Sequence, residues 1–125
     1  MKRIYLYMGI GCFVAMGFGL SGCYKDVISP ETDPDGPPQA VSFKVDLAPI
    51  FETKCASCHN PTGHKPFLAK DVSYQTIVNG GFVNTLVPKA SRLYQAVYGE
   101  MSEYIPSPKD KLKVYDWIRN GAPNN

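Results

Sequence analysis

The spacing of apolar and polar residues divides this chain of 125 residues into three parts. An uncharged and largely apolar run extends from Ile4 to Leu20. Residues 24–42 are rich in proline and acidic residues and carry few apolar side chains. From Phe43 to Ala122, apolar residues recur at the three- and four-residue intervals of amphipathic helices. The pattern predicts an N-terminal targeting segment, a linker and one small domain.

The apolar run has the organisation of an export signal. It follows the basic residues Lys2 and Arg3 and ends in Leu20-Ser21-Gly22-Cys23. These last four residues resemble the lipobox of bacterial lipoproteins, in which the cysteine is diacylated and becomes the first residue of the mature chain. The alternative is an uncleaved membrane span, because the run is near the lower length limit for one. Four glycines within the run favour cleavage. We therefore expect residues 1–22 to be a signal peptide and Cys23 to carry the lipid that anchors the protein to a membrane.

The segment between the lipid and the domain is expected to be a tether. Residues 23–42 combine a lipidated cysteine with a stretch rich in proline and aspartate, which has too little apolar surface to offset the entropy of ordering it. Cleavage removes Lys2 and Arg3 from the 13 basic residues, so 11 remain against 11 acidic ones. A mature chain so close to neutral gives no indication of a nucleic-acid partner.

Short helices explain the apolar spacing of the domain, residues 43–125. No segment shows convincing strand alternation, so the expected fold is all-α, with three to five short helices. The first helix is expected to start at an N-cap at Asp46 and to run into the motif that begins at Cys55. The second is expected to start at Ser73 and to stop at Asn79-Gly80-Gly81. The third is expected from Ser91 to Tyr98, with Gly99 as a left-handed stop.

The last helix has the clearest signals. Ser107 is expected as its N-cap, Pro108 at the first helical position and Asp110 near the positive end of the helix dipole. Gly121 and Pro123 end it. Its apolar face consists of Leu112, Val114, Tyr115, Trp117 and Ile118.

Cys55-Ala56-Ser57-Cys58-His59 carries the most specific chemistry in the chain. Two residues between the cysteines make about one helical turn, so both thiols reach the same edge of a haem and form thioethers with its two vinyl groups. His59 then ligates the iron from one face. The motif predicts one covalently bound haem c. The ring nitrogen of His59 that does not bind iron is expected to donate to a backbone carbonyl in the loop 60–66.

Three other interpretations of the motif are a structural disulfide, a thioredoxin-like redox pair and half of a zinc site completed by His59 and His64. A redox pair usually opens a helix after a strand, whereas this motif follows an amphipathic helical turn. A zinc site normally takes a second ligand pair well downstream, and the chain has no Cys or His beyond His64.

Several segments together resemble class I c-type cytochromes, and more narrowly the small monohaem domains of bacterial envelope proteins. These are Pro49-Ile50-Phe51 before the motif, Ser91-x-Leu93-Tyr94 in the middle, and Trp117-Ile118-x-x-Gly121-Ala122 near the end. The resemblance covers nearly all of the chain after the tether. It implies a helical fold in which the first and last helices cross beside the haem, with Trp117 and Tyr115 as aromatic residues of the core or beside the ring.

The resemblance also implies a distal methionine ligand on the loop before the last helix. Met101 is the one methionine after residue 22 and lies 16 residues before Trp117, about where the family places its ligand. The family often has Met-Pro there, whereas here Met101 precedes serine and the local proline follows Ile105. If Ile105 occupied that position, the sixth iron site would be open and would bind small ligands or perform peroxidase-like chemistry. His64 is too close to His59 to reach the opposite haem face and is expected at the surface.

The sequence thus predicts a membrane-anchored electron carrier of the bacterial cell envelope, not an enzyme, which passes single electrons between transient redox partners. We expect the protein to be held by its lipid in a membrane of the cell envelope, with the outer membrane slightly preferred. The domain is expected to face the periplasm or the cell surface. The alternatives are a haem protein with an open sixth site and a haem-free lipoprotein with a Cys55–Cys58 disulfide. Four lysines are candidates for a ring around an exposed haem edge: Lys54, Lys65, Lys70 and Lys89.

Overall fold

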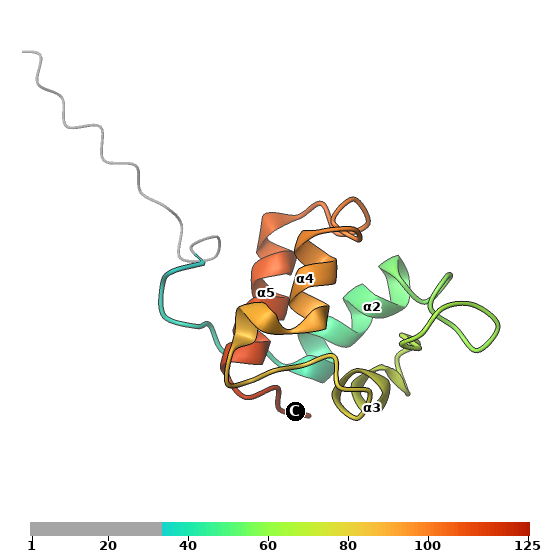
Figure 1. Ribbon diagram of the computed structural model, residues 1–125, viewed down its shortest axis with the longest axis horizontal. Helices are drawn as coiled ribbons and strands as arrows, with labels where there is room; N and C mark the ends of the chain where they lie inside the picture. Colours follow the sequence, from blue (N-terminus) through green and yellow to red (C-terminus); the bar gives the residue numbers. More distant parts are fainter. Residues whose placement is uncertain (1–33) are drawn as a thin grey trace, which may run out of the picture.

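Helices form all the regular secondary structure in the part of the chain that the computed structural model describes, residues 34–125 (Figure 1). The elements are the π-helix η2 (Phe43–Leu47), α2 (Ala48–Lys54), α3 (Ser73–Val78), the 3-10 helix η3 (Pro88–Ala90), α4 (Arg92–Tyr98) and α5 (Pro108–Arg119). No strand occurs within residues 34–125, so the all-α expectation is confirmed for them. The expected signal peptide and Cys23 lie outside the described residues.

The first helix begins at Phe43 with Ser42 as its N-cap, so the expected N-cap at Asp46 is wrong. The Ser42 hydroxyl accepts a hydrogen bond from the backbone N–H of Val45 at 3.2 Å, and the Asp46 carboxylate accepts one from the backbone N–H of Ser42 at 3.0 Å. This reciprocal pair satisfies two of the N–H groups that a helix start leaves unpaired. Asp46 therefore stabilises the first turn from inside the helix.

The other helix ends match the sequence signals, with one exception. α3 ends before Asn79, α4 follows Ser91, and α5 begins with Pro108 after the Ser107 hydroxyl accepts from the Asp110 N–H at 3.3 Å. Gly99 does end α4, but its φ of −112° is not left-handed, so that expectation is wrong. A Cβ at Gly99 would lie 2.6 Å from the Gln95 carbonyl oxygen, so the close approach of the backbone requires glycine there.

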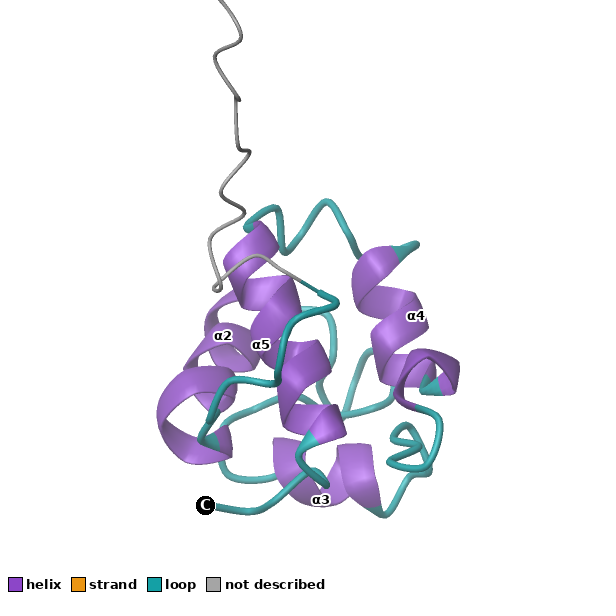
Figure 2. Ribbon diagram, turned by 90° about the vertical axis from the view of Figure 1, so that its left-hand side faces the viewer, coloured by secondary structure: helices purple, strands orange, loops and turns teal. Residues whose placement is uncertain are grey.

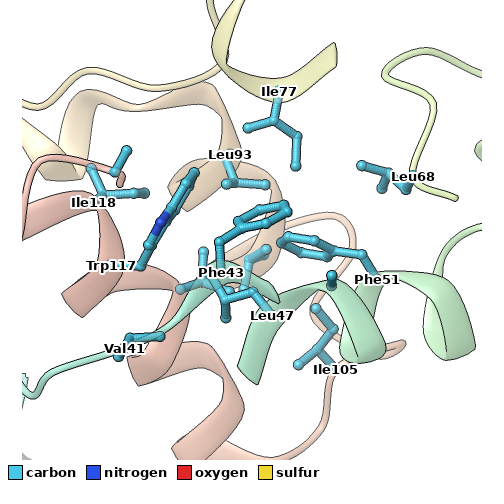
Figure 3. Close-up of a cluster of buried hydrophobic side chains, with 14 residues drawn as sticks. Val41, Phe43, Leu47, Phe51, Leu68, Ile77, Leu93, Ile105, Trp117 and Ile118 are labelled. Carbon is cyan, nitrogen blue, oxygen red and sulfur yellow. The ribbon is translucent and has the colours of Figure 1, made fainter. Parts of the chain in front are cut away.

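The core lies where the first helical segment meets α5. Figure 3 shows Phe43 between Trp117 and Phe51, with ring centroids 5.2 Å and 6.1 Å away, respectively. Tyr74 of α3 meets Phe43 edge-on at 5.1 Å. Trp117 is fully buried, and its indole N–H donates to the Pro123 carbonyl at 2.9 Å. These contacts fix α2, α3 and α5 relative to one another.

The apolar face predicted for α5 is buried throughout, and Figure 1 and Figure 2 both show this helix beside α4. Tyr115 packs against the ring of Tyr94 at 5.0 Å and under the guanidinium of Arg119 at 4.6 Å. Tyr115 and Trp117 are thus residues of the packing between helices.

The C-terminal end of the expected tether is folded onto α5. The buried Asp116 carboxylate accepts from the backbone N–H of Gln39 at 3.1 Å and from its side-chain amide at 3.2 Å. Arg119 pairs with Asp116 and also donates to the Gly36 carbonyl at 2.8 Å. Val41 is 5% exposed and belongs to the core. Residues from Gly36 to Val41, which the sequence assigned to the expected tether, are thus held against the helical part of the structure.

The Ser42–Asp46 pair makes a prediction about stability. The hydrogen bond from the Ser42 N–H is the largest cause that lowers the pKa of Asp46 below its ordinary value of 3.8, and Lys113 at 3.2 Å contributes. Because the folded pKa is lowered, the charged carboxylate stabilises the fold above about pH 3.8, and this stabilisation is lost as the pH falls through the folded pKa. Asp46→Asn is expected to lower the unfolding free energy by about 1 kcal/mol at pH 7, measured by urea denaturation.

The difference between the wild-type chain and Asp46→Asn is expected to shrink when the same measurement is made below pH 3.8. Asp71→Asn is the control, because Asp71 is exposed and precedes α3. An equal loss for Asp46→Asn at both pH values would contradict the charge-dependent role.

Candidate cofactor site

A cavity of about 500 Å³ lies between the end of α2 and α4. One side is formed by Phe51, the Cys-x-x-Cys-His motif and the loop that follows it to Leu68. The other side is formed by α4 and the loop after it to Ile105. The lining surface is mostly apolar, and the volume is in the usual range for a cofactor pocket. Five lining residues also belong to the core cluster: Phe51, Leu68, Leu93, Val97 and Ile105. Figure 3 labels all of these except Val97.

The cysteine motif continues the last turn of α2. The Phe51 carbonyl accepts from the N–H of Cys55 at 2.9 Å, and the Cys55 carbonyl accepts from the N–H groups of Cys58 and His59 at 3.1 Å and 2.9 Å. The expected single turn between the two thiols is therefore present. Both cysteines line the cavity as free thiols, Cys55 half-buried and Cys58 exposed. Burial raises the pKa of the Cys55 thiol, so this group stays protonated at neutral pH.

His59 is oriented by the loop that follows it. Its Nδ1 lies 3.1 Å from the Pro66 carbonyl oxygen, which can only accept, so Nδ1 carries the proton. The expected acceptor in the loop 60–66 is thus Pro66. This hydrogen bond leaves the lone pair on Nε2, the nitrogen that would coordinate a metal. The His59 carbonyl accepts from the Leu68 N–H at 2.8 Å, which fixes the loop on the cavity wall.

The return of this loop depends on a glycine that the sequence interpretation missed. The His64 N–H donates to the Cys58 carbonyl at 2.9 Å, and a Cβ at Gly63 would lie 2.2 Å from that same oxygen. Only glycine permits this approach without a backbone shift. The clue in the sequence is its place between the motif and Pro66, where a tight turn must bring the chain back to His59.

Met101 lines the same cavity as His59. Its N–H donates to the Ala96 carbonyl at 2.9 Å, which places it directly after α4, and its side chain is half-buried. Ile105 also lines the cavity. It is the residue that would leave the sixth iron site open if it occupied the position of the family's methionine. Ile105 is 2% exposed and packs in the core cluster, whereas Met101 is not part of that cluster. The structure therefore brings Met101 to the cavity without giving it a packing role in the core.

His64 is exposed, as expected, although it lies at the rim of the cavity. Its ring centroid is 6.2 Å from that of His59. In residues 34–125, no group of three or more His, Cys, Asp or Glu side chains is arranged to hold a metal ion. The geometry of the two cysteines and two histidines thus gives no support to the zinc interpretation.

Cations predominate among the charged residues at the cavity. Lys54, Lys65 and Arg92 line it, together with Glu100. Arg92 lies over the Phe82 ring at 5.0 Å. The sequence analysis did not predict a role for Arg92, whose position directly after Ser91, the N-cap of α4, is the one signal for it. Of the four lysines considered for a ring at the haem edge, Lys70 and Lys89 do not line the cavity.

Tyr104 is a further rim residue that the sequence interpretation missed. It is 51% exposed and lines the cavity between Met101 and Ile105. The neighbouring Glu103 carboxylate raises the pKa of the Tyr104 phenol, which therefore remains neutral at neutral pH. Tyr104 therefore contributes an uncharged aromatic ring to the lining of the cavity.

The described helices are all too short or too polar to cross a bilayer. Comparison of the chain with protein-family models, with curated proteins and with solved structures finds no match in any of the three.

Proposed function

We propose that this chain is a lipid-anchored monohaem c-type cytochrome that transfers single electrons between redox partners of the bacterial cell envelope. In this proposal Cys55 and Cys58 form the thioether bonds to haem c, and His59 and Met101 are the axial ligands. Cys23 carries the lipid. The protein is an electron carrier, and its partners bind transiently.

One observation carries the proposal: two free thiols, an oriented histidine and a methionine line one mostly apolar cavity. A haem needs this set, because its macrocycle is apolar, its vinyl groups face one edge and its iron takes ligands from both faces. The cations at the rim suit the negative propionates. The donor set and the surroundings therefore fit a haem.

Each residue has a role that follows from its position. The Cys55 and Cys58 thiols would hold the haem covalently, because each can add across one vinyl group and so form a thioether. The Pro66 carbonyl keeps the proton on Nδ1 of His59 and so holds Nε2 as the ligand. Bound haem supplies a one-electron iron couple, which a thioether ligand such as Met101 shifts toward the reduced state. Because Cys58 is exposed, a haem attached to it would have an edge near solvent, within reach of a partner protein.

The second candidate function is a haem protein with an open sixth site. It is favoured by one observation, that Ile105 lines the cavity as Met101 does. An aliphatic side chain cannot ligate iron, so in this case small molecules such as carbon monoxide would bind.

Replacement of Met101 tests the ligand assignment. In Met101→Ala, made in a host that attaches c-type haem, we expect loss of the weak far-red sulfur-to-iron band from the oxidised absorption spectrum. The midpoint potential is expected to fall by on the order of 0.1 V, because a soft thioether no longer stabilises reduced iron. Carbon monoxide is expected to bind the reduced variant faster than the wild-type protein.

Ile105→Val is the matched control, because it keeps an aliphatic residue at the neighbouring position and is expected to leave the band unchanged. A wild-type protein that has covalent haem but lacks the far-red band and binds carbon monoxide at once would support the open-site function instead. A one-electron Nernst curve for the wild-type protein is expected in redox titration.

Replacement of the cysteines tests covalent attachment. Cys55→Ser and Cys58→Ser are each expected to remove one thioether, and the double variant is expected to lose covalent haem entirely, as measured by the mass of the purified chain and by haem staining of denaturing gels. Ser57→Ala lies between the two cysteines and serves as the control. A wild-type chain with unmodified mass and a Cys55–Cys58 disulfide would refute the haem assignment.

A further inference from the structure

Leu86 and Val87 form an exposed apolar pair at the tip of the loop between α3 and α4. Leu86 is 92% exposed and Val87 56%, which makes Leu86 the most exposed large apolar side chain in the described part of the chain. Single exposed apolar residues are common on proteins, but loop tips usually carry polar residues. Two adjacent branched apolar side chains at one tip therefore require an explanation.

This tip is held in place by hydrogen bonds. The Asn84 side-chain oxygen accepts from the N–H groups of Leu86 and Val87 at 3.1 Å and 2.9 Å. Asn84 is in turn held by the buried Ser91, whose hydroxyl accepts from the Asn84 N–H at 2.8 Å and donates to its carbonyl at 3.2 Å. The backbone of the turn is thus fixed in a form that presents both side chains to the outside.

The pair lies on the side of the domain from which the chain continues toward Cys23. Lys89, two residues beyond Val87, is 4.0 Å from Asp35, and residues 36–41 are fixed on α5 by the bonds to Asp116 and Arg119. Figure 1 shows residues 34–40 at the opposite end of the domain from the loop that follows α2 and carries the cysteine motif. The folded end of the tether therefore ties one face of the domain to the anchor.

We propose that Leu86 and Val87 insert into the lipid surface to which Cys23 anchors the protein. This inference rests on the lipid anchor of the proposed function. Eleven residues lie between Cys23 and Asp35, a reach of at most roughly 40 Å, so the Leu86–Val87 pair stays at high effective concentration near the bilayer. A weak apolar contact is then sufficient to orient the domain.

The chemistry of this face favours the apolar interior of a bilayer over anionic head groups. Lys89 is paired with Asp35, and Arg119 with Asp116, so each of these two cations already has a carboxylate partner within the protein. The contact is therefore independent of anionic lipid and of salt. Its consequence is a defined orientation: the cysteine motif faces away from the membrane, where a partner has free access to it.

The test uses the full-length chain, matured with haem and lipid and reconstituted into vesicles of phosphatidylethanolamine and phosphatidylglycerol at a ratio of 3 to 1. A nitroxide is attached to Leu86→Cys and, as the matched control at the opposite end, to Thr62→Cys. Electron paramagnetic resonance then measures the accessibility of each label to oxygen and to a water-soluble nickel complex. Both positions are exposed, so neither substitution removes a core contact.

When vesicles are added, we expect the ratio of oxygen accessibility to nickel-complex accessibility to rise several-fold for the label at position 86. For the label at position 62, the ratio is expected to keep the value it has in water. Adding Val87→Asp to the Leu86→Cys chain is expected to return its label to water, and high salt is expected to change nothing. A chain that floats with vesicles but has an aqueous label at 86 overturns the lipid contact while the anchor stands. Lipid exposure at both positions overturns the orientation. A chain that does not float overturns the anchor and this inference together, and its haem spectrum reports separately on the cofactor assignment.

Discussion

Phe43 packs against Trp117, Phe51 and Tyr74, and through these contacts it joins α2, α3 and α5. The Phe43–Trp117 contact joins the first helical segment to the last helix, with ring centroids 5.2 Å apart. The two residues lie near opposite ends of the described sequence. Aromatic pairs of this kind contribute about 0.5–1.5 kcal/mol beyond the burial of their surface. Phe51 lies in α2, which follows the helical turn that holds Phe43, and it extends the same cluster to the cavity wall. The end of α2, and with it the cysteine motif, is therefore positioned by a contact far away in the sequence.

Core and cavity share their walls in this domain. Phe51, Leu68, Leu93 and Ile105 each pack in the hydrophobic cluster and also line the cavity. A small domain buries a modest core, and an apolar cofactor in this position would extend that core. In the proposed function, the haem is thus part of the hydrophobic interior as well as the redox centre. Binding of the cofactor would stabilise the same contacts that position its ligands.

The two ends of the domain have separate roles in the proposed protein. One end carries the cysteine motif and the exposed rim of the cavity, where a partner would dock. The other end carries the folded part of the tether, held by the buried Asp116, and the Leu86–Val87 turn. A carboxylate this deeply buried is tolerated because two donors of Gln39 and the guanidinium of Arg119 satisfy it. The same bonds make the linker a fixed extension of α5 as far back as Gly36.

Most of the helices and the single-turn geometry of the cysteine motif could be predicted from the sequence alone, because both depend on residues that are neighbours in the chain. Ser107, Pro108 and Asp110 mark the start of α5, and the spacing of Cys55, Cys58 and His59 defines their geometry within one turn. Tertiary structure decided what depends on distant partners. Only the fold selected Pro66 as the acceptor for His59, required glycine at position 63, brought Met101 and Ile105 to one cavity and attached residues 36–41 to α5. Asp46 and Gly99 were misjudged for a related reason: local signals name good caps and stops, but packing against the rest of the chain selects which residue is used.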